Sequence, residues 1–172
     1  MLPFNQGALD SLCGIYSVVN ADRILNMTPK EGSKELFSEI IHFLSRKRWL
    51  SSILTEGMML KHVSAILEQV MGSRIPLQEM PFRGVATPDL DAFWAALSTF
   101  LDGQNRRVVL LATNGLYDHW TVIQSLTDNQ INLFDSYRLR KLPRAYCTTS
   151  GVKGRRQHHL LPAQTFFLSA GA

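Results

Sequence analysis

The chain has 172 residues, of which 45% are hydrophobic and 19% charged, and a formal net charge of +4. This size and composition fit one globular domain with a substantial core, and no apolar stretch reaches the roughly 20 residues that a membrane span needs. The first residues, MLPFNQGALD, carry neither the basic start nor the apolar core of a signal peptide. They therefore favour a cytoplasmic protein, with a secreted or translocated effector as the alternative.

Helices are predicted throughout the first part of the chain. An extended lead-in comes first, and apolar residues then recur at a spacing close to 3.6, which is typical of a helix with one buried face. The third predicted helix starts near Thr55-Glu56 and stops at Gly72, and Thr87-Pro88-Asp89 caps the fourth, with proline in its first turn. The predicted helices span residues 13–26, 33–46, 55–72 and 87–103, and residues 75–85 are predicted to be extended.

The second part changes to strand patterns. The run RRVVLLAT (106–113) predicts a buried strand, and two alternating runs, 119–126 and 130–136, predict a hairpin. Residues 138–158 are irregular and basic, and 159–170 has strand character, with Pro162 indicating an edge or a bulge. Helices followed by antiparallel strands predict an α+β fold. We expect one domain over 1–172, with a helical lobe (about 1–103), a sheet lobe (about 104–172) and any active site between them.

Cys13 stands where the first predicted helix begins. Unpaired N–H groups and the helix dipole favour negative charge at that end, and the thiolate is the nucleophilic form of cysteine. Gly14 lets a backbone or a substrate approach closely. The chain's other cysteine is Cys147, and two cysteines without metal-ligand spacing predict neither a disulfide framework nor a zinc site. Two interpretations of Cys13 remain open, a nucleophile and a packed core residue.

His119 and Asp135 are the candidate partners of Cys13. His119 opens the first strand of the predicted hairpin, and Asp135 ends the second. Because a short turn joins the strands, the two residues are expected side by side, where the carboxylate orients the imidazole. The alternatives are a structural histidine and a turn cap. The other histidines lie on predicted helices or beside the basic segment: His42, His62, His158 and His159.

An acyl-transfer site also needs donors for a developing oxyanion. The Cys13 N–H and the side-chain amide of Gln6, in the lead-in, are the candidates, and Asn5 is adjacent. Trp120, beside His119, either shields the pair from water or packs in the core. Gly14, Trp120 and Asn5 are therefore predicted to contact substrate.

These residues resemble the papain-like cysteine peptidase superfamily in its Cys-His-Asp form. The stretch from Gln6 to Cys13-Gly14-Ile15-Tyr16 is similar to the nucleophile helix of phytochelatin synthases and bacteriocin-leader peptidase domains. His119-Trp120-Thr121 resembles their histidine strand, and Phe134-Asp135-Ser136 their aspartate segment. Gln6 lies seven residues before Cys13, where the superfamily usually has six. Either the loop holds an extra residue, or Asn5, Ser11 or a backbone group replaces Gln6.

The resemblance implies a papain-like fold, with the nucleophile helix packed on the sheet lobe. It implies a thiol protease or related hydrolase that cleaves an amide or isopeptide bond, with Cys13 as nucleophile, His119 as base and acid, Asp135 as orienter and Gln6 as oxyanion donor. No cofactor or metal is expected, and the substrate is a peptide or protein. The same triad also serves acyltransferases, transglutaminases and deamidases of the effector type, and a non-catalytic peptide-binding module is the remaining alternative.

The excess of positive charge lies late in the sequence, over 138–156. It fits a solvated basic surface or an acidic partner. Nucleic acid ranks last, because no aromatic interleaving or binding motif accompanies the charge.

Overall fold

The computed structural model describes residues 1–7, 10–85, 88–103, 105–151, 154 and 156–170. Its helices are α1 (Cys13–Leu25), α2 (Lys30–Arg46), α3 (Leu50–Glu56), α4 (Leu60–Gln69) and α5 (Leu90–Leu101). Its strands are β1 (Leu77–Glu79), β2 (Arg107–Gly115), β3 (His119–Leu126), β4 (Gln130–Leu133), β5 (Lys141–Pro143), β6 (Cys147–Thr148), β7 (His158–Leu160) and β8 (Phe166–Ser169). Short 3-10 turns occupy Arg144–Tyr146 and Pro162–Gln164.

The strands form one sheet in the order β1-β8-β2-β3-β4-β5, and β7 also pairs with β2. The pairs are antiparallel except for β6 with β7. The predicted α+β class is therefore confirmed. No helix in the described part of the chain is long and apolar enough to cross a membrane.

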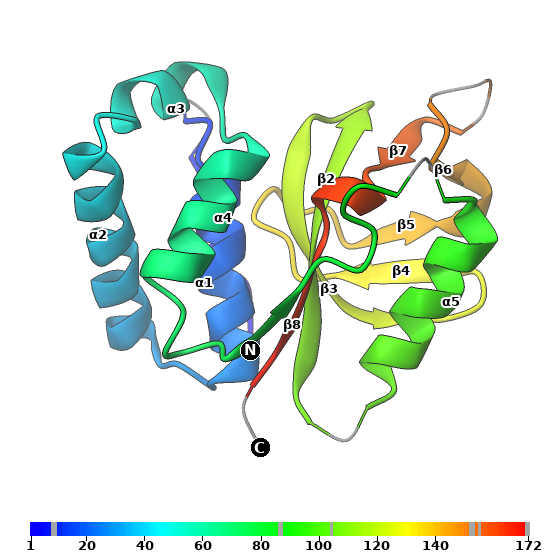
Figure 1. Ribbon diagram of the computed structural model, residues 1–172, viewed down its shortest axis with the longest axis horizontal. Helices are drawn as coiled ribbons and strands as arrows, with labels where there is room; N and C mark the ends of the chain where they lie inside the picture. The colour runs from blue at the N-terminus through cyan, green and yellow to red at the C-terminus, as the bar shows by residue number, and fades with distance from the viewer. Residues whose placement is uncertain (8–9, 86–87, 104, 152–153, 155, 171–172) are drawn as a thin grey trace.

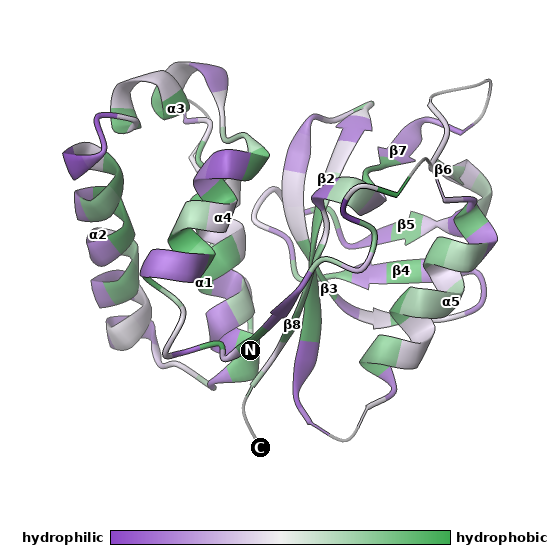
Figure 2. Ribbon diagram, viewed as in Figure 1, coloured by the Kyte–Doolittle hydropathy of each residue, from purple (hydrophilic) through white to green (hydrophobic). Residues whose placement is uncertain are grey.

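Helices cover both faces of this sheet (Figure 1). Alternate residues of β2 belong to different cores: Val108 and Leu110 belong to the core shared with α1, α2 and α4, whereas Val109 and Leu111 belong to the core shared with α5. A strand covered on both faces needs apolar side chains at every position, which explains the unbroken VVLLA run. Figure 2 shows the apolar side of α2 turned toward α1 and α4.

The position of α5 corrects the predicted division into lobes. Phe93, Trp94 and Leu97 of this helix are buried against the sheet, on the face opposite α1. The helical lobe thus comprises α1 to α4, and α5 belongs with the sheet. The helix begins at Leu90, and Asp89 caps it by accepting a hydrogen bond from the N–H of Ala92 at 2.6 Å. Pro88 precedes the cap rather than occupying the first turn, and Thr87 lies outside the described residues.

The predicted third helix is wrong as a single element. The structure has two helices, α3 and α4, separated by Gly57, which has a φ of +82°. Only glycine adopts that backbone region without strain, so the helix breaks there. The break turns the chain so that Met58 packs beside the start of α1, where Gly14 leaves room for its side chain.

The hairpin prediction is confirmed, since β3 spans His119–Leu126 and pairs with β4. The segment predicted as irregular contains β5 and β6, which are too short to show an alternating pattern. The interruption expected at Pro162 is a 3-10 turn between β7 and β8.

Candidate active site

Cys13 is the first residue of α1 and is 8% exposed. Leu12 precedes it and offers no side-chain cap, so the positive end of the helix remains open to a negative group. Asp10 organises the approach: one carboxylate oxygen accepts from the N–H of Gly7 at 2.8 Å, and the other from the N–H of Leu12 at 3.1 Å. This second bond is an Asx turn, which the Asp-Ser pair before the helix is suited to form.

His119 and Asp135 are joined by a hydrogen bond of 2.6 Å between Nε2 and Oδ1. The β3–β4 register pairs Ile123 with Leu133. The bond from the Phe134 N–H to the Val122 carbonyl continues this register past the end of β4, which brings Asp135 opposite Thr121 and makes His119 its diagonal neighbour. The predicted juxtaposition is present. Asp135 is fully buried, and its other oxygen accepts from the backbone N–H groups of Tyr137 at 2.6 Å and Leu139 at 3.1 Å.

The electrostatics of this group favour a charged imidazole. Burial lowers the pKa of His119, but hydrogen bonds to Asp135 and to Cys13, together with the negative charges of both, raise it to about 9. For Asp135 burial acts in the opposite direction and raises the pKa. The hydrogen bond and the charge interaction with His119 outweigh burial and keep the pKa of Asp135 below its ordinary value. Since Nε2 is engaged by Asp135, the Nδ1 side of the ring is left for the Cys13 sulfur. The arrangement fits a cysteine nucleophile whose base is an imidazole held by a carboxylate.

Gln6 is held at the same place by the segment that follows Asp135. Its backbone N–H donates to the carbonyl of Ser136 at 3.0 Å, and its side-chain oxygen accepts from the Ser136 hydroxyl at 3.4 Å. With the oxygen so engaged, the amide N–H₂ group is free to donate elsewhere, as an oxyanion donor must. Gln6, His119 and Cys13 all line one cavity of about 680 Å³.

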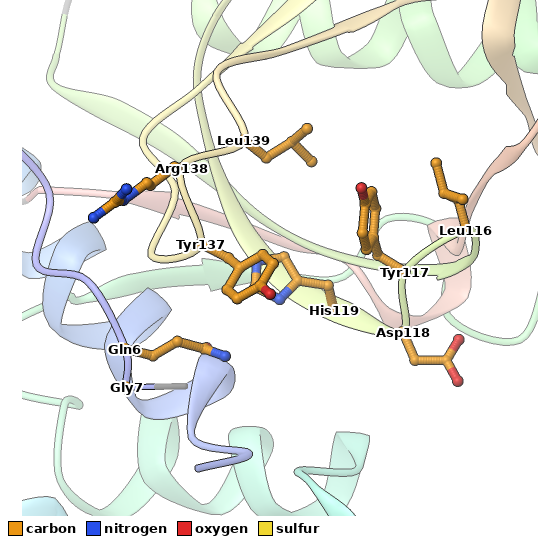
Figure 3. A pocket seen from close by; sticks show the side chains of 9 residues that line it. All are labelled: Gln6, Gly7, Leu116, Tyr117, Asp118, His119, Tyr137, Arg138 and Leu139. Atoms are coloured by element: carbon orange, nitrogen blue, oxygen red, sulfur yellow. The ribbon is translucent and has the colours of Figure 1, made fainter. Parts of the chain in front are cut away.

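A second cavity of about 570 Å³ adjoins the first. Gln6, Asp118 and His119 line both cavities, so the two are neighbours at the imidazole, and together they are called the groove below. Figure 3 shows the residues that line the second cavity: Tyr137 lies beside His119, while Tyr117 and Leu116 lie on the opposite side from Gln6.

Two of the residues predicted to contact substrate are absent from the linings of both cavities. Gly14 is buried, and a Cβ added to it would lie 2.7 Å from the sulfur of Met58. The glycine therefore makes room for a protein side chain, not for a substrate. Asn5 is exposed and is absent from the linings of both cavities. Ser11 lines the larger cavity.

Trp120 is packed in the core and also lines the cavity. It is 4% exposed, and its indole N–H donates to the carbonyl of Met58 at 2.7 Å. Its own carbonyl accepts from the hydroxyl of Ser17 at 2.7 Å. It also lines the cavity that contains Cys13. Ser17 lies one turn after Cys13, a position that nothing in the sequence marks as linked to the histidine strand.

The remaining candidates lie elsewhere. Cys147 is buried in the core on the α5 face, away from the Cys13 core, and both cysteines are free. His62 is buried in α4 and accepts from the N–H of Met59 at 3.1 Å, and His159 contacts the Thr149 carbonyl. Within the described ranges, no group of three or more His, Cys, Asp or Glu residues is placed to hold a metal ion.

The basic segment is only partly a free surface. The Arg144 guanidinium is 2.6 Å from the carboxylate of Asp91 and stacks 4.9 Å from the ring of Trp94, so it ties the sheet to α5. Arg138 instead lines the smaller cavity. Lys153 and Arg155, which the sequence groups with them, lie outside the described residues.

Comparison with known proteins gives no relative: no family model, no curated protein and no solved structure matches this chain.

Proposed function

We propose that the chain is a thiol hydrolase of the papain-like type that cleaves an amide or isopeptide bond. The observation that carries the proposal is the arrangement of His119 between Asp135, bonded at 2.6 Å, and Cys13 at the open end of α1. A packed core cysteine has no need of a buried imidazole–carboxylate pair beside it. Burying that pair has a cost in desolvation, which a catalytic role justifies.

The first half-reaction forms an acyl-enzyme. The Cys13 thiolate attacks the substrate carbonyl, and the negative charge moves to the carbonyl oxygen. The Cys13 N–H and the Gln6 amide donate to that oxygen. The C–N bond then breaks as His119 transfers its proton to the leaving nitrogen, which leaves a thioester on Cys13 and a neutral imidazole.

The second half-reaction clears the thioester. Neutral His119 takes a proton from water, whose oxygen attacks the acyl carbon, and the C–S bond breaks. The products are a carboxylic acid and the restored thiolate–imidazolium pair. Asp135 holds the ring orientation in both halves.

The superfamily assignment belongs to the same proposal. The order Cys, His, Asp along the chain, and the packing of the nucleophile helix against β2 and β3, support it. The same site also fits two related reactions. In transamidation an amine replaces water as the group that attacks the acyl-enzyme. In deamidation the acyl-enzyme forms from a side-chain amide instead of a peptide bond.

The test is product analysis on a peptide library derived from a whole proteome. Wild type, Cys13→Ala and Cys147→Ser are incubated with the library, and products are identified by mass spectrometry. The proposal predicts new peptide termini with wild type and Cys147→Ser, and none with Cys13→Ala. If the products that depend on Cys13 are instead deamidated or cross-linked peptides, the reaction is deamidation or transamidation and not peptide hydrolysis. Products that persist in Cys13→Ala would contradict a thiol mechanism.

A further inference from the structure

The smaller cavity of the groove has an apolar wall that the triad does not require. Leu116, Tyr117 and Tyr137 are 51%, 44% and 58% exposed, and they line the cavity together with Leu139 (Figure 3). Large apolar side chains that gather on one rim mark a binding surface more often than scattered ones do. Here they come from two loops, one before β3 and one after β4, that meet beside His119.

Hydrogen bonds from the site itself fix both loops. The hydroxyl of Thr113 lies 3.3 Å from the carbonyl oxygens of both Tyr117 and His119 and shares its one proton between them. On the other side, the carboxylate of Asp135 accepts from the N–H groups of Tyr137 and Leu139. The residue that orients the imidazole therefore also shapes this wall, which is held open in advance of binding.

The backbone between these two N–H groups is strained. Arg138 has a φ of +65°, a region that residues other than glycine adopt at a cost. Tyr137, Arg138 and Leu139 all line the cavity, so this strained position lies in its wall.

The cavity adjoins the one that contains Cys13, because Gln6, Asp118 and His119 line both. A chain whose scissile carbonyl lies at Cys13 and Gln6 passes His119 on its way into the smaller cavity. About 570 Å³ is enough for a large side chain.

We infer that this cavity is a specificity subsite for an apolar, preferably aromatic, side chain of the substrate near the bond that is cleaved. This inference rests on the proposed function and names its substrate class. Tyr117 and Tyr137 supply aromatic ring surface to the lining, and Leu116 and Leu139 complete the wall.

The test uses alkylating probes that share one reactive group. Iodoacetamide is compared with N-benzyl, N-phenethyl and N-(phenylpropyl) iodoacetamide, and each rate of Cys13 modification is divided by that of the same probe with a small free thiol. Burial of a phenyl ring predicts an advantage on the order of tenfold for at least one aryl probe over iodoacetamide. Probes with cyclohexyl groups report whether an aromatic ring is preferred.

Three variants locate the effect. Tyr117→Ala and Tyr137→Ala, alone and combined, are expected to remove the aryl advantage, so that the normalised rates of the aryl probes fall to that of iodoacetamide on the same variant. Tyr146→Ala is the matched control, because Tyr146 is 48% exposed on a 3-10 turn outside the groove. Equal normalised rates for all probes on wild type, or an advantage that survives the double substitution, would overturn the inference. A sluggish reaction with iodoacetamide itself would count against the proposed function, while the ratio of probe rates would still report on the subsite.

Discussion

The hydroxyl of Ser17 donates a buried 2.7 Å hydrogen bond to the backbone carbonyl of Trp120. Ser17 is one helical turn beyond Cys13, and Trp120 follows His119, so this bond fixes the nucleophile helix against the histidine strand. The two halves of the proposed ion pair are thus positioned by a contact outside the triad.

Removal of this bond is expected to weaken both the fold and the site. Ser17→Ala leaves the Trp120 carbonyl buried without its partner, which costs about 1–3 kcal/mol in the free energy of unfolding. It should also slow alkylation of Cys13 at neutral pH. Ser33→Ala is the control, since Ser33 is equally buried but bonds within its own helix, to Pro29. A loss of stability with unchanged Cys13 reactivity in Ser17→Ala would show that the contact is structural only.

The elevated pKa of His119 predicts a pH dependence of stability. A folded pKa of about 9, above the ordinary 6.5, means that the folded protein holds this proton more tightly than the unfolded chain does. The resulting stabilisation is complete below pH 6.5 and is lost as the pH rises through about 9.

Asp135→Asn removes a main source of this shift. The difference in free energy of unfolding between wild type and Asp135→Asn should therefore be largest below pH 6.5 and shrink toward pH 9, as measured by urea denaturation across that range. Asp118→Asn is the control, because Asp118 lines the groove and is not the carboxylate bonded to His119. Parallel pH curves for wild type and Asp135→Asn would contradict this electrostatic account.

The contact between Gly14 and Met58 predicts a mutational rescue. Gly14→Ala places a methyl group 2.7 Å from the Met58 sulfur, an overpacking that costs about 1–3 kcal/mol. Met58→Ala alone leaves a cavity, but the double variant Gly14→Ala/Met58→Ala should be more stable than the sum of the two single effects. A double-mutant cycle by thermal or urea denaturation measures this coupling. Strict additivity would mean that Gly14 has another role.

The sequence predicts the positions of site residues where one local pattern fixes the geometry. The juxtaposition of His119 and Asp135 follows from a hairpin whose strands are visible as alternating runs. The start of α1 at Cys13 follows from helical periodicity. Gln6 is predicted from its amide side chain in the extended segment before Cys13, and the bond to Ser136 explains how it is held there.

The features that the sequence does not predict depend on contacts between distant segments. The apolar period of α5 shows that one face is buried, but not against which face of the sheet. The role of Gly14 depends on Met58, 44 residues later, and on the positive φ of Gly57. The aromatic wall of the smaller cavity comes from two loops whose sequences, read singly, resemble ordinary turns.

Cys147 should be inert in the folded protein. Burial raises the pKa of its thiol to about 12, and the sulfur lies against the carbonyl of Pro143. At neutral pH we expect iodoacetamide to modify Cys13 alone, and both cysteines only after denaturation. Peptide mapping by mass spectrometry checks this, and rapid native modification of Cys147 would contradict the packing around it.

The most direct test of the central claim is the rate of Cys13 alkylation by iodoacetamide as a function of pH, in a Cys147→Ser background. Wild type is compared with His119→Gln and with the matched control His62→Gln, which replaces another buried, hydrogen-bonded histidine. Circular dichroism and thermal melting establish that each variant is folded. The account predicts rapid alkylation that persists at about pH 6 in wild type and His62→Gln, where an ordinary thiol is almost unreactive, and its loss in His119→Gln. An ordinary pH profile that is the same in all three proteins would show that Cys13 is a packing residue and that the chain has no thiolate–imidazolium pair.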